Sequence, residues 1–327
     1  MKLSVIVATR NRVHAIAACL DSIAGALAKA APLDAEIIVV DNGSTDATTE
    51  VVEAWRSASA IPVKLLLEPV SGQGRALNCA LRSAEGELLA FTDDDCRLHS
   101  DYVIDLLRHD SADTGLVLRG GRIELGDPED FSFTINTEPT RKCWSLALNS
   151  ARHDYIAGKL NGCNMAMRRA LYDRIGPFDE NFGPGSKMGS GADTDFLFRT
   201  YLAGVPLEYV PDMAVYHHHG RRTAEAGRAL WCKYMIGSGG LYAKYMFVHP
   251  SLCRVLFSDI RRVADEITSG SNLFLPEIDF SHKQRVAYSL RGAARYIFMH
   301  KDRSALAMWK AQHAREAAKA AATRLPT

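Results

Sequence analysis

The first hundred residues alternate between short apolar runs and longer segments with apolar residues at helical spacing, and this alternation limits the possible folds most strongly. Four short runs are predicted strands, at 3–9, 36–41, 63–68 and 87–92. Three intervening segments are predicted helices, at 13–27, 46–57 and 75–84, the second with Ser44 or Thr45 as its N-cap. Because the strands are apolar throughout and helices separate them, we predict an α/β fold with a mostly parallel, Rossmann-like sheet covered on both faces.

The rest of the chain is less regular and becomes helical towards its end. Strands are predicted at 116–123, at 164–167 and, as one or two short segments, within 207–217. Helices are predicted at 141–151, from 168 to 175 and at 194–203, and the glycine-rich segment 183–191 is predicted to be a mobile loop. From residue 220 onward, apolar and basic residues recur at helical spacing. We therefore expect a domain of residues 1–219, with halves 1–110 and 111–219, followed by a helical region, 220–327.

The composition is that of an ordinary globular protein. Of 327 residues, 47% are hydrophobic and 24% charged, which excludes a disordered chain, a collagen-like repeat and a disulfide-stapled miniprotein. The seven cysteines are odd in number and have no CxxC spacing, which argues against a disulfide framework and against a cysteine zinc site. The apolar start is too short for a signal-peptide core, and no apolar run reaches the roughly 18 residues of a spanning helix. We therefore expect a cytoplasmic protein.

The formal net charge of +1 hides two regions of opposite sign. Residues 1–219 hold 21 Lys and Arg against 30 Asp and Glu, a net charge of −9, and residues 220–327 hold 18 against 8, a net charge of +10. The near-zero total argues against nucleic acid as a partner of the whole protein. The basic region is interpreted as a helical subdomain with solvated charges, and a peripheral contact with anionic lipid at the inner face of the cytoplasmic membrane is kept as a functional hypothesis. The alanine-rich segment 305–322 leaves an oligomer contact open.

Three consecutive aspartates, Asp93, Asp94 and Asp95, directly follow the fourth predicted strand. Carboxylates packed together repel one another unless a cation neutralises them. Oxygen ligands suit Mg²⁺ or Mn²⁺, with substrate phosphates completing the coordination shell. The alternative is a solvated turn that leads into the next helix. We favour the metal site.

Polar residues also follow the other predicted strands, as expected where the carboxyl ends of a parallel sheet meet. Thr9 and Arg10 end the first strand and Asp41 ends the second. The Asp41 carboxylate can accept from the N–H of a nucleobase or can form an Asx turn. Gly72 and Arg75 precede a helix without matching GxGxxG or a P-loop lysine motif, so Arg75 either reaches a diphosphate or lies on the surface.

Two features of the second half have a structural and a functional interpretation. Three histidines begin at His217, and because adjacent side chains point in different directions, one of them is a candidate ligand and a three-histidine zinc site is not expected. Asp193 opens a predicted helix after the glycine-rich loop, where an aspartate is ordinarily a cap or a helix-dipole partner. A carboxylate beside a mobile loop also suits a general base.

Taken together, these segments resemble family 2 glycosyltransferases, which have the GT-A fold. The resemblance runs from about residue 4 to residue 219 and rests on the order of several motifs, since a DxD motif alone is common. The motifs are SVIVATRNR, VVDNGSTD, SGQGRALNCAL, FTDDDC, NGCNMAMRR, GSGADTDFLFRTYLAG and VPDMAVYHHH.

The resemblance implies a role for each matching residue. Asp193 would be the general base, and Asp95 and His217 would bind the metal, with His219 as an alternative histidine. Gly162, Asn164 and Ala192 would lie on the acceptor side, where Ala192 replaces the glutamate usual in the family. The donor-binding residues would be Thr9, Arg10, Asp41, Gly72, Arg75, Asp93 and Asp94.

The resemblance also implies a reaction: inverting transfer of a sugar from a nucleotide diphosphate sugar to an acceptor hydroxyl, with bound Mn²⁺ or Mg²⁺. A UDP-sugar is favoured as the donor, and the acceptor would be a sugar, a glycan or a lipid-linked group. Two alternatives stay open. A nucleotidyltransferase usually has a glycine-rich phosphate loop after the first strand, which the segment from Thr9 to Arg12 lacks. A non-catalytic nucleotide-sugar-binding protein is suggested by Ala192 alone.

Overall fold

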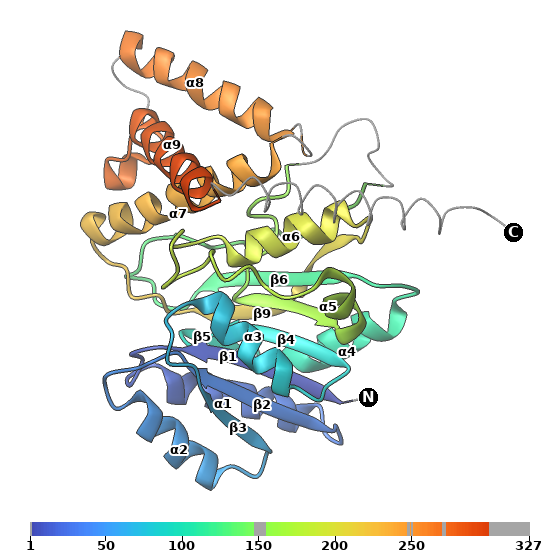
Figure 1. Cartoon of the computed structure of the whole chain (residues 1–327). Coiled ribbons are helices and arrows are strands. Elements are labelled where there is room, and N and C mark those ends of the chain that lie inside the picture. Colours follow the sequence, from blue (N-terminus) through green and yellow to red (C-terminus); the bar gives the residue numbers. More distant parts are fainter. Residues whose placement is uncertain (1, 147–154, 247–248, 250, 270–272, 301–327) are drawn as a thin grey trace, which may run out of the picture.

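The computed structural model describes residues 2–146, 155–246, 249, 251–269 and 273–300, and its centre is a nine-stranded mixed sheet (Figure 1). The strands follow the order β3-β2-β1-β4-β8-β6-β9-β5, and β7 pairs with β9. Six strands run parallel to one another: β1 (Leu3–Thr9), β2 (Ala35–Asp41), β3 (Val63–Leu67), β4 (Leu88–Asp93), β6 (Leu118–Leu125) and β9 (Leu207–His217). Three run antiparallel to their neighbours: β5 (Cys96–Leu98), β7 (Lys142–Trp144) and β8 (Asn164–Arg168). The predicted mostly parallel α/β sheet is confirmed.

Helices cover both faces of the sheet because alternate residues of its strands point to opposite sides. Leu3, Val5 and Val7 of β1 pack with the helices of one face, which are α1 (Ile16–Lys29), α2 (Thr48–Ala58) and α4 (Tyr102–Ala112). Ile6 of the same strand packs into the core of the other face, with α3 (Gln73–Ser83), α5 (Arg169–Ile175) and α6 (Ala192–Leu202). The buried strands therefore have apolar residues on both sides, as predicted.

The C-terminal region is helical, also as predicted, and stacks on α6 on the side away from the sheet (Figure 1). It contains α7 (Ala224–Tyr245), α8 (Ser251–Ser269), the short 3-10 helix η1 (Pro276–Ile278) and α9 (His282–Met299). Glycines let α7 approach its neighbours closely: a side chain at Gly237 would collide with Ser190, and one at Gly239 with the backbone of α9 at Ser289. In the described part of the chain, no helix has both the length and the apolar character needed to cross a membrane.

A buried ion cluster joins α6 to α7. Asp195 is fully buried and accepts hydrogen bonds from Arg199 (2.9 Å), from the Lys244 ammonium (2.6 Å) and from the Tyr245 hydroxyl (2.7 Å). Burial by itself would raise the pKa of Asp195, but the charges of Lys244 and Arg199 outweigh it and lower the pKa to about 2. The helix that begins at Asp193 is thereby fixed to the C-terminal region.

Two details of the predicted elements were wrong. The helix expected at 141–151 is replaced over Lys142–Trp144 by strand β7, which pairs with β9, and residues 147–151 lie outside the described part. Helix α2 begins at Thr48 rather than after Ser44 or Thr45, and the Asp46 carboxylate accepts from the Thr48 N–H (3.1 Å). The segment 207–217 forms one strand, which is one of the two predicted possibilities. The expected oligomer contact at 305–322 also falls outside the described residues.

The glycine-rich segment 183–191 is tied down at several points, in contrast to the free loop that was predicted. Its Ser186 hydroxyl donates to the Asn181 carbonyl (2.8 Å), and its Ser190 hydroxyl donates to the Lys233 carbonyl of α7 (2.9 Å). The side chain of Met188 is fully buried in the core. Residues 183, 185, 189 and 191 have a positive φ, which glycine adopts without a steric penalty, so here the glycines serve sharp turns.

Candidate active site

The aspartates that follow β4 meet a histidine from the end of β9. Strand β5, which begins directly after Asp95, pairs antiparallel with β9 so that Cys96 lies opposite His217. Asp95 Oδ1 is consequently 3.2 Å from His217 Nε2. Asp93, Asp95 and His217 each offer one ligand atom, and the three atoms lie within 4.8 Å of one another. Residues far apart in the sequence thus form one compact group of oxygen and nitrogen donors.

The electrostatics of this group favour a bound cation. Burial, together with the charge of Asp95, raises the pKa of Asp93 to about 7. Burial would also raise the pKa of Asp95, but its hydrogen bond to His217 and the His217 charge lower it overall. A divalent ion between these groups would offset both the burial and the repulsion. Carboxylate and imidazole donors suit Mn²⁺ and accommodate Mg²⁺, so the residues present fit the expected metal.

Of the three histidines, His217 is the one that faces the carboxylates. Its Nδ1 is 3.0 Å from the Thr134 hydroxyl, and this contact orients the ring. His219 instead places Nε2 2.8 Å from the Phe131 carbonyl, while its Nδ1 accepts from the Arg221 N–H (3.0 Å). Both nitrogens of His219 therefore have partners in the loop beneath the site.

Arg12 is a site residue that the sequence reasoning did not single out. Its guanidinium donates to Asp94 Oδ1 (3.0 Å) and to Asp95 Oδ2 (3.1 Å). Burial raises the pKa of Asp94, and the charge of Arg12 opposes that rise. The signal was present in the turn after the first strand, where Arg12 stands two residues from Arg10. Arg10 itself donates its N–H to Asp94 Oδ2 (3.3 Å) and its guanidinium to the Ser71 hydroxyl.

The remaining predicted donor residues lie along the same edge of the sheet. Thr9 is buried at the end of β1, directly beside Asp41 at the end of β2. Asp41 accepts from the Ser44 N–H (2.8 Å), three residues along the chain, and from the Thr49 hydroxyl of α2. Each carboxylate oxygen can accept more than one hydrogen bond, so a further acceptor position remains.

Gly72 and Arg75 stand at the start of α3. Gly72, at φ +150°, donates its N–H to the Asn42 side chain (2.7 Å), which fixes the loop to the end of β2. Arg75 forms an ion pair with Glu180 (2.9 Å) and is partly exposed. Its guanidinium is therefore already partnered within the chain.

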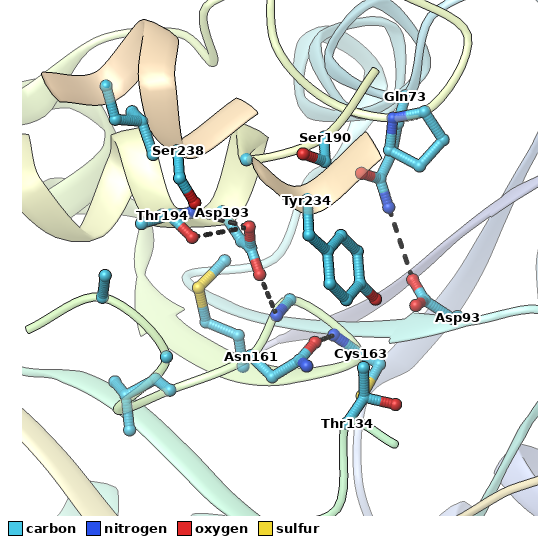
Figure 2. Close-up of a pocket in the computed structure, with 18 of the residues that line it drawn as sticks. Gln73, Asp93, Thr134, Asn161, Cys163, Ser190, Asp193, Thr194, Tyr234 and Ser238 are labelled. Carbon is cyan, nitrogen blue, oxygen red and sulfur yellow. Dashed lines mark hydrogen bonds between the residues drawn. The ribbon is translucent and has the colours of Figure 1, made fainter. Parts of the chain in front are cut away.

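Asp193 lies across a cavity from Asp93, the member of the Asp93–Asp95–His217 group that lines it (Figure 2). It stands in the first turn of α6, where its Oδ1 accepts from the Thr194 N–H (2.7 Å) and its Oδ2 accepts from the Gly162 N–H (3.0 Å). A side chain at Gly162 would come within 3.1 Å of the Asp193 Cβ, so the close approach needs a glycine there. The carboxylate is thereby held in one orientation.

The cavity has a volume of about 460 Å³, and both Asp93 and Asp193 line it. Its far wall comes from α7, which contributes Trp231, Tyr234 and Ser238. Burial raises the pKa of Tyr234, whose ring lies between Asp193 and Asp93 (Figure 2). A space of this size, with aromatic walls and carboxylates at two ends, suits a sugar-sized ligand.

Two residues expected on the acceptor side do not face the cavity. Asn164 is fully buried, and its amide donates to the Arg122 and Met213 carbonyls (both 2.9 Å) beside the irregularity in the β6–β9 pairing. Ala192 is buried in the core, where its Cβ would lie 3.0 Å from a side chain at Gly183. Neither side chain lines the cavity, and their acceptor-side role stays a prediction.

The sheet, the carboxylates at its strand ends and the opposed Asp193 define a glycosyltransferase of the GT-A fold. The family model described as glycosyl transferase family 2 matches residues 4–176, and the chain belongs to this family.

The chain is similar to several named glycosyltransferases. It is 25% identical to the glycosyltransferase AglE of Haloferax volcanii over 255 residues, which are 77% of each chain. It is 36% identical over 220 residues to the poly(ribitol-phosphate) beta-N-acetylglucosaminyltransferase TarS of Staphylococcus aureus. That match covers 66% of this chain but 35% of TarS, so the chain corresponds to about a third of the full relative.

Solved structures give the same fold. The crystal structure of S. aureus TarS 1–349 in complex with UDP-GlcNAc has a TM-score of 0.51 and 26% identity, covering 72% of this chain and 67% of that one. The mannosyltransferase PcManGT of Pyrobaculum calidifontis, in complex with GDP-Man and Mn²⁺, has a TM-score of 0.51 over 99% of this chain and 81% of its own. At 20% identity, the second likeness concerns the fold alone.

Proposed function

We propose that this glycosyltransferase moves a sugar from a nucleotide diphosphate sugar, with a UDP-sugar favoured, to an acceptor hydroxyl with inversion at the anomeric carbon. The observation that carries the proposal is the cavity lined by Asp93 and by Asp193, because Asp93 belongs to the donor group that also contains Asp95 and His217. The UDP-GlcNAc in the related TarS structure supports the choice of donor. The acceptor class is a sugar, a glycan or a lipid-linked group.

Asp95 and His217 would hold Mn²⁺ or Mg²⁺, with Asp93 beside them. When bound, such an ion supplies Lewis-acid stabilisation of the negative charge on the departing nucleoside diphosphate. Arg12 neutralises Asp94 and one oxygen of Asp95, which leaves Oδ1 of Asp95 facing His217. The donor nucleotide would lie along Thr9, Arg10, Asp41 and Gly72, and Arg75 would need to leave Glu180 to reach a phosphate.

Asp193 would take the proton from the acceptor hydroxyl as that oxygen attacks the anomeric carbon from the face opposite the leaving group. The N–H groups of Gly162 and Thr194 hold its carboxylate in place, so little reorganisation is needed during the reaction. The aromatic wall from α7 would exclude water from the space between donor and base. Orientation of the base and exclusion of water would thus both be provided by residues already in place, without movement of the glycine-rich segment 183–191.

A panel of labelled nucleotide sugars, each incubated with the protein and Mn²⁺, tests the proposal. Slow hydrolysis of one donor, dependent on the cation and abolished by EDTA, is the expected result. Pyrophosphate release would point instead to a nucleotidyltransferase, and binding without turnover to a non-catalytic nucleotide-sugar-binding protein. Either result would overturn the proposed reaction.

Replacing Asp95 with asparagine should weaken Mn²⁺ binding by at least roughly 10- to 100-fold. A loss of that size is typical when a residue that only supports a metal ligand is replaced, and a direct ligand should matter at least as much. The physical reason is the loss of one charged donor beside His217. Asp94→Asn is the matched control, because it removes the same charge from the neighbouring residue, which faces Arg12. Titration of Mn²⁺ followed by electron paramagnetic resonance measures both variants, and equal affinities would refute the assignment of Asp95.

We also propose a peripheral membrane contact through α8, which carries exposed Phe257 (73%), Ile260 (51%) and Ile267 (73%). Arg261 and Arg262 are exposed on the same helix, and its periodicity places Arg261 beside the stripe and Arg262 on the opposite side. A helix with adjacent apolar and basic residues suits the surface of an anionic bilayer.

We expect the protein to sediment with anionic vesicles at low salt and to be released at high salt. Phe257→Glu should abolish sedimentation, because it places a charge in the apolar stripe. Ile104→Glu, at an exposed apolar position of α4 (38% exposed), is the control that should still bind. Absence of binding at low salt would remove the membrane contact.

A further inference from the structure

Two cysteine thiols also lie close to the metal-site histidine. Cys96 opens β5 opposite His217, and Cys163 immediately precedes β8. All three residues are buried. One ligand atom from each of Cys96, Cys163 and His217 lies within 4.8 Å of the other two.

The chemistry of this second donor set differs from that of the first. Carboxylate oxygens suit hard cations such as Mg²⁺ and Mn²⁺, whereas two thiolates and an imidazole suit Zn²⁺ and softer metals. The cavity gives a path inwards, because Cys163 and Asp93 both line it. The absence of CxxC spacing, which had argued against a cysteine zinc site, does not apply here, since the fold brings distant cysteines together.

His217 is common to both donor sets. Its Nδ1 already faces the Thr134 hydroxyl at 3.0 Å, which leaves one nitrogen for a cation. A cation held by the two thiols therefore competes with one held by Asp95 for the same imidazole.

We propose that Cys96, Cys163 and His217 form a binding site for a thiophilic divalent cation such as Zn²⁺, and that its occupation inhibits sugar transfer by withdrawing His217 from the carboxylates. On binding, each thiol releases its proton to solvent as a metal–sulfur bond forms, and the neutral imidazole donates a lone pair. The inhibition rests on the proposed function. The binding does not, because it depends only on these three side chains.

The binding is tested with Co²⁺ as a spectroscopic probe in the full chain. Cys143, which is exposed, is replaced by serine in every protein compared so that it cannot bind metal at the surface. We expect an intense near-ultraviolet thiolate-to-cobalt absorption, which Zn²⁺ abolishes by displacement. Cys96→Ala should lose this band and weaken Zn²⁺ binding by at least about 10-fold, whereas Cys79→Ala, a partly buried cysteine of α3, should leave both unchanged.

The inhibition is tested by adding Zn²⁺ to the Mn²⁺-dependent transfer assay. Zn²⁺ should inhibit the parent protein, and the inhibiting concentration should rise at least about 10-fold in Cys96→Ala. Circular dichroism of the metal-free variants checks their folding, and Cys163→Ser takes the place of Cys96→Ala if the latter does not fold.

The possible results separate the two proposals. No thiolate band, or unchanged Zn²⁺ affinity in the cysteine variant, overturns the thiophilic site. A thiolate band without inhibition overturns the competition for His217. A thiolate band in a protein that transfers no sugar upholds the site and refutes the proposed function.

Discussion

Replacing Asp193 with asparagine should lower the rate of sugar transfer by roughly two to four orders of magnitude, the usual contribution of a general base. The amide cannot take the proton of the acceptor hydroxyl at neutral pH. Metal-dependent binding of the nucleotide should be almost unchanged, because Asp193 lies across the cavity from Asp93 and the other carboxylates. Single-turnover transfer and calorimetric titration of the nucleotide measure the two effects separately.

Asp173→Asn is the matched control for this substitution, since it makes the same chemical change at an exposed position of α5. It should transfer sugar at the wild-type rate. If Asp193→Asn also turned over at the wild-type rate, another group would have to be the base. A loss of nucleotide binding in Asp193→Asn would mean instead that this carboxylate supports the donor site.

Asp195 lies two residues after Asp193 in the same helix. Its replacement by asparagine should cost about 3–5 kcal/mol of folding stability. The substitution removes the charge that Lys244 and Arg199 share, and these two cations would remain buried beside a neutral amide. Asp173→Asn again serves as the control and should change stability little. Chemical denaturation measures the free energy of unfolding, and a loss well below 1 kcal/mol would show that the cluster contributes no net stability.

The same cluster predicts how stability depends on acid. The folded pKa of Asp195, about 2, lies below its ordinary value of 3.8, so its stabilisation is complete above pH 3.8 and is lost as the pH falls towards 2. Each pKa unit corresponds to about 1.4 kcal/mol, which gives a contribution of roughly 2 kcal/mol. Denaturation curves of Asp195→Asn should lack this component between pH 4 and pH 2, whereas an unchanged pH dependence would contradict the assignment.

The sequence predicted the first half of the fold well because its signals are local. Each strand from β1 to β4 is a short apolar run, and each helix between them has its own periodicity. The position of Asp41 and Asp93 at one sheet edge follows directly from parallel pairing. The family resemblance then supplied Asp193 and His217 as members of the same site, which spacing alone did not.

What could not be predicted depends on tertiary contacts. Lys142–Trp144 is a strand because β9 offers an edge with which to pair, although its own sequence has a helical pattern. Arg12 acquires its role from carboxylates that lie far away in the sequence. By its position in the first turn of a helix, Asp195 is typical of a residue that interacts with the helix dipole. Its ion pair with Lys244 arises only because α7 packs against α6.

The ion cluster at Asp195 also bears on how long a fragment of the chain must be in order to fold. The family match ends at residue 176, before Asp193, His217 and the aromatic wall of α7. A fragment cut at residue 219 would hold both carboxylate groups of the site, yet it would expose Asp195, Phe198 and Tyr201, which are fully buried in the intact chain. The segment that the family model matches is therefore shorter than the segment that we expect to fold as one unit, which extends at least to Tyr245.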